Sequence, residues 1–151
     1  MSQLDDIHAA IADRIRASGI DSTVNVFDYE PDDFPLPAVI VAPSPDTYIE
    51  YHGTFGASRI QTVKLVVTIY VPIGGSAQSA SKKIAEYLSS GTAETSSLAD
   101  AITGNGVAIG SSTAAIIADR AEGFMNGTLT RAQTTPVKKC DIPVTVTLQR
   151  S

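Results

Sequence analysis

The fold of this chain is decided by one stretch, Arg59-Ile-Gln-Thr-Val-Lys-Leu-Val-Val-Thr-Ile-Tyr-Val71. Its odd-numbered positions from Val63 to Val71 are all apolar, whereas most even-numbered positions are polar or amphipathic. Because successive side chains of a strand point to opposite faces, this alternation predicts a β-strand with one buried face and one mixed face. Ile60 and Val66 are the apolar exceptions on the mixed face.

The predicted strand is long for a chain of 151 residues. It would extend roughly 43 Å at about 3.3 Å per residue, whereas a compact domain of this length is about 38 Å across. We therefore expect it to cross the whole domain and to project at one end. A projecting strand end is typical of a contact surface, so Val66 and Tyr70 on the mixed face are candidate interface residues.

Composition indicates one folded domain over residues 1–151, since 43% of the residues are hydrophobic and 18% are charged. The net charge of -5 disfavours binding of DNA through neutralised phosphates. The basic doublets Lys82-Lys83 and Lys138-Lys139 are interpreted as solvated faces. With one cysteine, no signal-peptide pattern and no long apolar run, we expect a soluble protein made in the cytoplasm, with no membrane partner.

Before the long strand, the apolar stripe of an amphipathic helix extends from Leu4 to Ile15, and Gly19 is expected to end this helix. A short strand over 24–29 and an extended proline-rich loop over 30–37 follow. The apolar run 38–42 predicts a strand buried on both faces. The segment from Thr47 to Val71 predicts a long antiparallel hairpin with its tip at 52–56.

After the long strand, Ser76 is expected to cap a second helix, whose apolar face comprises Ala77, Ala80, Ile84, Tyr87 and Leu88. A short helix is expected over 98–102, ended by Gly104-Asn-Gly106, and a strand over 114–121. Asn126-Gly127 is the strongest hairpin dipeptide. The alternation from Cys140 to Leu148 predicts a final strand after Pro136, and Pro143 within it predicts a sheet edge or a bulge.

No set of residues indicates catalysis or a bound metal. His8 and His52 are interpreted as partly solvated, and Cys140 as a buried structural thiol. Gly74-Gly75-Ser76 lies between a strand and a helix, where phosphates often bind, but the Lys-Ser/Thr pair of a nucleotide-binding loop is missing. We therefore expect no enzymatic activity and no cofactor.

The order of these features resembles the tail terminator family of long-tailed bacteriophages, especially those of actinobacterial hosts. The resemblance covers most of the chain and is carried by three segments, Val26-Phe-Asp-Tyr-Glu-Pro-Asp32, Pro37-Ala-Val-Ile-Val-Ala-Pro43 and Tyr51-His-Gly-Thr-Phe-Gly56. It implies an α+β fold, with a mixed, mostly antiparallel sheet, the long hairpin at its centre and two to three helices packed on one face.

The resemblance also implies a homo-hexameric ring in the virion, at the junction of head and tail. Such a ring caps the tail tube, ends its elongation and binds the head-completion (stopper) protein, while DNA passes only as cargo. Candidate contact residues are Thr54 and Phe55 in the hairpin tip, and candidate lumen or rim residues are Glu30, Asp32 and Asp33 in the proline-rich loop.

Two alternatives remain open at this point. The chain could be another connector or neck protein of the virion, which the sequence hardly separates from a terminator. It could instead be a small-ligand module or enzyme with its site at Gly74 to Ala77. Observation of a ring would favour either structural role over the ligand module.

Overall fold

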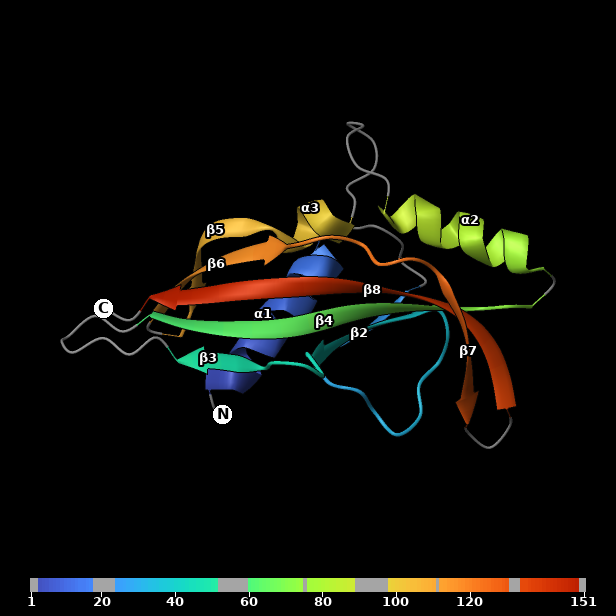
Figure 1. Ribbon diagram of the computed structural model, residues 1–151, viewed down its shortest axis with the longest axis horizontal. Coiled ribbons are helices and arrows are strands. Elements are labelled where there is room, and N and C mark those ends of the chain that lie inside the picture. Colours follow the sequence, from blue (N-terminus) through green and yellow to red (C-terminus); the bar gives the residue numbers. More distant parts are fainter. Residues whose placement is uncertain are drawn as a thin grey trace.

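The computed structural model describes residues 3–17, 24–51, 60–74, 76–88, 98–110, 112–130 and 134–149 (Figure 1). Its helices are α1 (Gln3–Ala17), α2 (Ala77–Leu88) and α3 (Leu98–Ile102). Its strands are β1 (Asn25–Phe27), β2 (Ala38–Pro43), β3 (Ile49–Tyr51), β4 (Ile60–Pro72), β5 (Gly104–Ile109), β6 (Ser112–Ala118), β7 (Met125–Thr130) and β8 (Thr134–Gln149).

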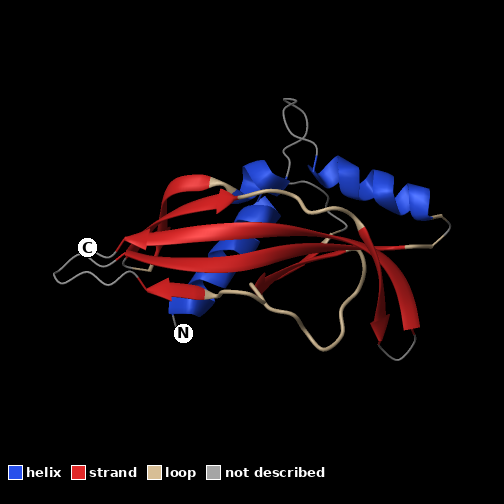
Figure 2. Cartoon of the chain, viewed as in Figure 1, coloured by secondary structure: helices blue, strands red, loops and turns tan. Residues whose placement is uncertain are grey.

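The strands form one curled sheet in the order β1-β2-β4-β8-β6-β5, with β3 added beside β4 and β7 beside β8 (Figure 1). The β1–β2 pair is parallel, and the other described pairs are antiparallel. The predicted fold class is therefore confirmed as α+β with a mixed, mostly antiparallel sheet. Figure 2 shows the helices beside this sheet rather than between its strands.

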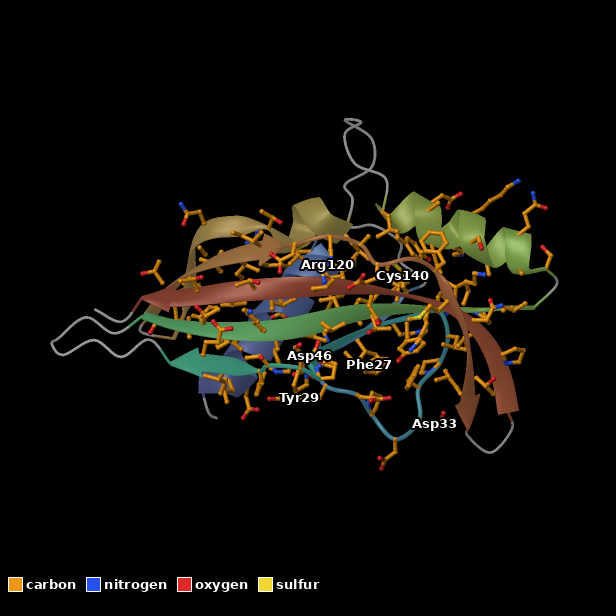
Figure 3. All side chains as sticks on the ribbon, viewed as in Figure 1. Phe27, Tyr29, Asp33, Asp46, Arg120 and Cys140 are labelled. Atoms are coloured by element: carbon orange, nitrogen blue, oxygen red, sulfur yellow. The ribbon has the colours of Figure 1, made fainter. Side chains whose placement is uncertain are left out.

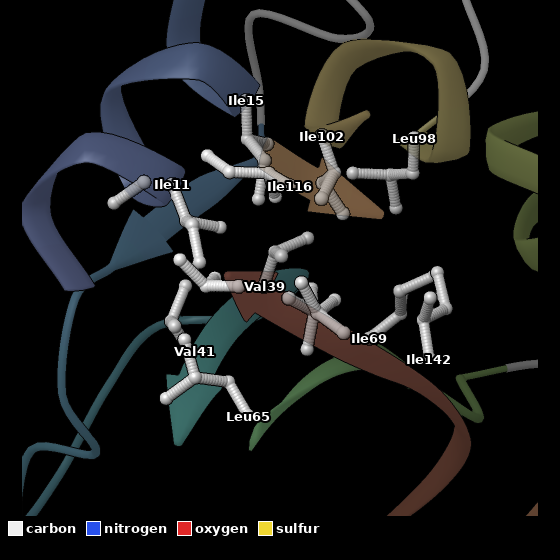
Figure 4. Packing of buried hydrophobic residues seen from close by; sticks show 14 of the residues in the cluster. Ile11, Ile15, Val39, Val41, Leu65, Ile69, Leu98, Ile102, Ile116 and Ile142 are labelled. Atoms are coloured by element: carbon white, nitrogen blue, oxygen red, sulfur yellow. The ribbon is translucent and has the colours of Figure 1, made fainter. Parts of the chain in front are cut away.

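The long strand is β4, and its alternation is confirmed. Its core face carries Val63, Leu65, Val67, Ile69 and Val71, each at most 3% exposed. These side chains pack in one cluster with residues of α1, α2 and α3. Figure 4 shows isoleucines and leucines of α1 and α3 packed toward β2, β4 and β8. All three helices thus cover the same face of the sheet.

The main partner of β4 is not the hairpin strand that we expected. The hairpin from β3 to β4 does form, but β3 pairs only from Ile49↔Val63 to Tyr51↔Gln61. On the same side of β4, β2 occupies the register from Pro43↔Leu65 to Ala38↔Tyr70. On its other side, β8 pairs along the whole of β4. Because the chain breaks at Pro43 to Asp46, this edge of β4 pairs with two short strands, β2 and β3. The one continuous partner of β4 is therefore β8, from the C-terminal end of the chain.

Neither outcome predicted for Pro143, a sheet edge or a bulge, is found. β8 lies between β4 and β6, and its register with β4 continues unbroken through Pro143. Pro143 lies opposite Val66 of β4, and its carbonyl accepts a 2.9 Å hydrogen bond from Asp119 N. The missing N–H points to the same side as this carbonyl. There β6 pairs from Val144 onward and β7 only as far as Lys139. The proline is tolerated because neither strand pairs with β8 at this position.

Two glycine-rich signals were assigned wrongly. Gly104-Asn-Gly106 is the start of β5, where the register shifts before Val107 and Gly106 has a φ of 68°, which glycine adopts without strain. Asn126-Gly127 lies within β7, with Gly127 opposite Val137. The β7–β8 register closes at Thr130↔Thr134, so the turn falls outside the described residues, and β8 begins before Pro136.

Candidate functional site

The helices leave the opposite face of the sheet, here called the open face, with a cleft of about 480 Å³. The even-numbered residues of β4 and the odd-numbered residues of β8 form its floor. The segment after β2 and the segment after β6 form its walls, and Figure 3 labels Asp46 and Arg120 on opposite sides of the β4–β8 pair. Its lining includes Pro43, Pro45, Asp46, Lys64, Val66, Thr68, Asp119, Arg120, Glu122, Lys139, Asp141, Pro143 and Thr145.

The centre of the floor is apolar. Val66 and Pro143 lie opposite each other in the β4–β8 register, and both are partly exposed. Val66, the apolar exception on the mixed face, therefore lines the cleft instead of the core. Val66 is therefore partly accessible from the open face, and its role as an interface residue stays a prediction.

Two threonine–aspartate pairs flank this apolar centre. Thr68 Oγ1 donates a 2.8 Å hydrogen bond to Asp141 Oδ1, and Thr145 Oγ1 donates one of the same length to Asp119 Oδ2. The acceptors in both pairs are carboxylates, and such charge-assisted bonds are stronger than neutral ones. Each of the two carboxylates is thus held along the cleft by a hydrogen bond to one of its oxygens.

Two of the cations that line the cleft form ion pairs with nearby glutamates. Lys64 Nζ lies 2.9 Å from Glu50 Oε1, and Arg120 Nη2 lies 3.1 Å from Glu122 Oε1. All four side chains are at least 41% exposed, so these pairs contribute little to stability. Lys139 also lines the cleft, and its neighbour Lys138 points to the other face of the sheet because side chains alternate.

Cys140 lies beneath the cleft on the core face and is fully buried. Its Sγ is 3.2 Å from Glu122 O, the acceptor of its thiol hydrogen bond. Burial, together with the nearby charges of Asp141 and Glu122, raises the pKa of the thiol to about 11. A thiol with a raised pKa and no exposed surface is a weak nucleophile, which agrees with the structural role predicted for Cys140.

Large apolar side chains are exposed beside the cleft. Ile117 is 52% exposed and lies opposite Thr145, while Met125 is 44% exposed and lies opposite Lys139. Directly opposite residues of an antiparallel pair share a face, so both apolar side chains belong to the open face. Large exposed apolar side chains next to a cleft are typical of protein contact surfaces.

The proline-rich loop covers the part of the open face at which Tyr70 lies. Phe34 is 5% exposed and lies 5.6 Å from the Tyr70 ring, in a small cluster with Ala38, Ile40 and Leu129. Burial raises the pKa of Tyr70, with smaller effects from Glu30 and Asp141. Tyr70 is thus half of an intramolecular contact, which the sequence analysis did not foresee.

The other interface candidates are placed as follows. Glu30, Asp32 and Asp33 are exposed on the proline-rich loop that Phe34 anchors. Thr54 and Phe55, like His52, lie outside the described residues. Asp119, Asp141 and Thr145 were not among the residues predicted from the sequence. Asp141 and Thr145 were detectable as polar alternates of the final strand, but nothing local indicated that Asp119 would lie beside them.

The interpretation of His8 as partly solvated is wrong, because its side chain is fully buried. Its Nδ1 lies 2.8 Å from Asp28 O and its Nε2 lies 2.9 Å from the Tyr48 hydroxyl. A carbonyl can only accept, so in the neutral ring Nδ1 donates to Asp28 and Nε2 accepts from Tyr48. The Tyr29 ring stacks on the imidazole at 4.1 Å. Both ring nitrogens are engaged in joining α1 to two loops.

The alternative ligand site at Gly74 to Ala77 has a small hollow of about 170 Å³, lined in part by Gly74, Ser76 and Lys83. Ser76 Oγ accepts a 3.1 Å hydrogen bond from Ser79 N, which confirms Ser76 as the cap of α2. That hydrogen bond occupies one of the amides that an anion would need. An anion bound here would therefore find one helix amide already occupied.

Comparison with known proteins assigns no family to this chain. No protein-family model matches it, and no curated protein matches it. Among similar solved structures, one of a protein without a descriptive name aligns over 97% of this chain and 96% of its own. Its sequence identity is 21% and its TM-score is 0.42, values that establish no shared function.

None of the helices among the described residues is long and apolar enough to cross a membrane. In the same part of the chain, no group of three or more histidine, cysteine, aspartate or glutamate side chains is arranged to hold a metal ion.

Proposed function

We propose that this protein is a tail terminator, a structural subunit of a homo-hexameric ring at the head–tail junction of a long-tailed bacteriophage. The ring caps the tail tube, ends elongation and binds the head-completion protein. It has no enzymatic activity and no cofactor, and DNA passes through it only as cargo. The resemblance of three sequence segments supplies this hypothesis.

The observation that carries the proposal is the unlike character of the two sides of the sheet. One side is closed by three helices. The other has an open cleft with exposed Ile117 and Met125 beside it. A ring that closes by head-to-tail contacts needs two different surfaces on each subunit, and its upper and lower faces then remain chemically distinct. Distinct faces allow one end to bind the tube without reproducing the surface on which the tube grows.

The acidic loop fits the passage of DNA. Glu30, Asp32 and Asp33 are exposed, and the buried Phe34 next to them fixes the loop on the sheet. Carboxylates at the lumen or rim of a ring repel phosphates, whereas a lumen rich in lysine and arginine would hold DNA through released counterions. We therefore place these three residues at the lumen or rim.

Negative-stain microscopy and mass photometry of the purified protein test the proposal. We expect six-fold rings with a mass of six chains. Co-sedimentation with tail tubes and with head connectors then separates a terminator from another neck protein, because a terminator binds the end of the tube. A protein that stays monomeric at tens of micromolar, and binds neither assembly, would refute the structural role.

A further inference from the structure

The charged side chains near α2 are divided between the two sides of the sheet. Lys138 lies opposite Val71, a core residue, and therefore points to the side that the helices cover. Lys82 and Lys83 lie on α2, on the same side. Together with Glu86 of α2, these residues at the α2 end of the helix-covered side are here called the basic side, which has three cations and one carboxylate. α1 covers the same side of the sheet and carries both signs, namely Asp5, Asp6, Asp13, Arg14 and Arg16.

The cleft on the open face instead has more carboxylates than unpaired cations. Lys64 is paired with Glu50, and Arg120 with Glu122. Of the other charged residues that line the cleft, three are carboxylates and one is a cation, namely Asp46, Asp119, Asp141 and Lys139. Hydrogen bonds from the Thr145 and Thr68 hydroxyls orient the side chains of Asp119 and Asp141 in the cleft. One subunit thus presents a cationic region at α2 on the helix-covered side of its sheet and an anionic cleft on the other side.

We propose that the cleft on the open face binds the basic side of a second copy of this chain, an inference that rests on the proposed ring. Complementary potentials on opposite sides of one subunit favour a head-to-tail contact. A two-fold symmetric contact would instead place carboxylates against carboxylates. The exposed Ile117 and Met125 add apolar area beside the cleft, so that charge sets the orientation and apolar burial adds affinity.

Charge reversal tests this contact on the full-length protein. Lys82 and Asp119 are both exposed. Asp119→Lys also removes the acceptor of the Thr145 hydroxyl, so the folding of each variant is measured alongside its assembly. Lys82→Glu alone and Asp119→Lys alone each place like charges across the contact. We expect each to weaken assembly about tenfold or more, measured by sedimentation velocity in about 0.1 M salt. The double variant restores opposite charges across the contact and should assemble as the wild type does.

A matched control is Asp13→Lys, which makes the same charge change as Asp119→Lys on α1, at an exposed side chain that pairs with Arg16 in a surface contact. It should assemble normally, and thermal unfolding should show that all variants fold. If the wild type forms rings and both single variants do too, the inference is wrong while the proposed function stands. If the double variant stays dissociated, direct pairing is refuted. If the wild type forms no oligomer, the proposed function fails first.

Discussion

Thr68 and Asp141 lie opposite each other in the β4–β8 pair, and the Thr68 hydroxyl donates a 2.8 Å hydrogen bond to Asp141 Oδ1. Thr68 is 8% exposed although it lies on the open face. A nearly buried hydroxyl needs a partner, and the carboxylate supplies one while remaining partly exposed in the cleft. This pair thus links the stability of the central strands to the charge of the candidate contact surface.

We predict that Thr68→Val lowers the free energy of unfolding by about 1 kcal/mol, because it removes the hydrogen bond to Asp141. The loss stays small because water can replace the hydroxyl at the partly exposed carboxylate. Urea denaturation monitored by circular dichroism measures this change. Asp141→Asn is the complementary variant, which keeps an acceptor for Thr68 and removes the charge. It should be closer to wild type in stability. A larger loss for Asp141→Asn would show that the carboxylate has further partners.

His8→Phe should destabilise the protein by about 2–4 kcal/mol. Phenylalanine fills the space of the imidazole and preserves stacking on Tyr29, but it leaves the Asp28 carbonyl and the Tyr48 hydroxyl without their partner. Tyr48→Phe removes one of the two hydrogen bonds and should cost about 1 kcal/mol. Chemical denaturation of both variants compares them, and equal losses would mean that the Asp28 contact contributes nothing measurable.

The sequence predicted those parts of the fold that depend on local periodicity. The alternation in β4, the apolar run of β2 and the stripe of α1 each determined an element and its buried face correctly. The partners of β4 could not be predicted in this way. Pairing with β8 joins residues far apart in sequence, and its register depends on the packing of both core faces. Pro143 was misplaced for the same reason, since its missing N–H matters only relative to where β6 ends and β7 begins.

The candidate surface was predicted only in part. Val66 was identified because an apolar residue on a mixed face is unusual. Asp119 belongs to the segment after β6, and only the β6–β8 register brings it to Thr145. His8 was misread because a single polar residue beside an apolar stripe is usually solvated. Its burial depends on Asp28 and Tyr48, which the folded loops bring to it.

Alkaline pH should destabilise the protein more than it would if all its tyrosines had their ordinary pKa in the folded state. The hydrogen bond from the Tyr29 hydroxyl to Asp5 Oδ1 raises the pKa of Tyr29, and burial raises that of Tyr48 and Tyr70. A raised pKa in the folded state means that the unfolded chain loses its protons first. The stabilisation is therefore complete below pH 10, the ordinary value, and is lost as pH rises above it.

Unfolding experiments between about pH 8 and pH 11 measure this loss. Tyr29→Phe removes one of the raised groups, so its stability should fall less steeply with pH than that of the wild type. The ultraviolet absorbance of tyrosinate, recorded on the folded protein, gives the titration independently. Parallel stability curves for the two proteins would show that Tyr29 does not contribute to the pH dependence.

The thiol of Cys140 should react slowly with a disulfide reagent at pH 8. It is fully buried, and its pKa is raised to about 11, so both access and the thiolate fraction are low in the folded state. In denaturant the same thiol should react at the rate of a free cysteine. Kinetics followed by released chromophore measure both rates. Rapid reaction of the folded protein would show that the β6–β7 connection opens readily above Cys140.

Val66 and Val67 are neighbours on β4 whose side chains lie on opposite faces of the sheet. Substitutions at both positions test whether the open face is a contact surface. Val67 is fully buried among the helices, so Val67→Asp places a carboxylate in the core and should unfold the chain. Val66 lines the cleft, so Val66→Asp should change the free energy of unfolding by about 1 kcal/mol or less. In the proposed ring, however, Val66→Asp removes apolar area from the floor of the contact and buries a carboxylate there, so it should weaken assembly.

Thermal unfolding measures the stability of the two variants, and mass photometry measures their assembly. If Val66→Asp unfolds as Val67→Asp does, the mixed face of β4 is part of the core. If it folds and forms rings as the wild type does, the subunit contact lies elsewhere on the molecule.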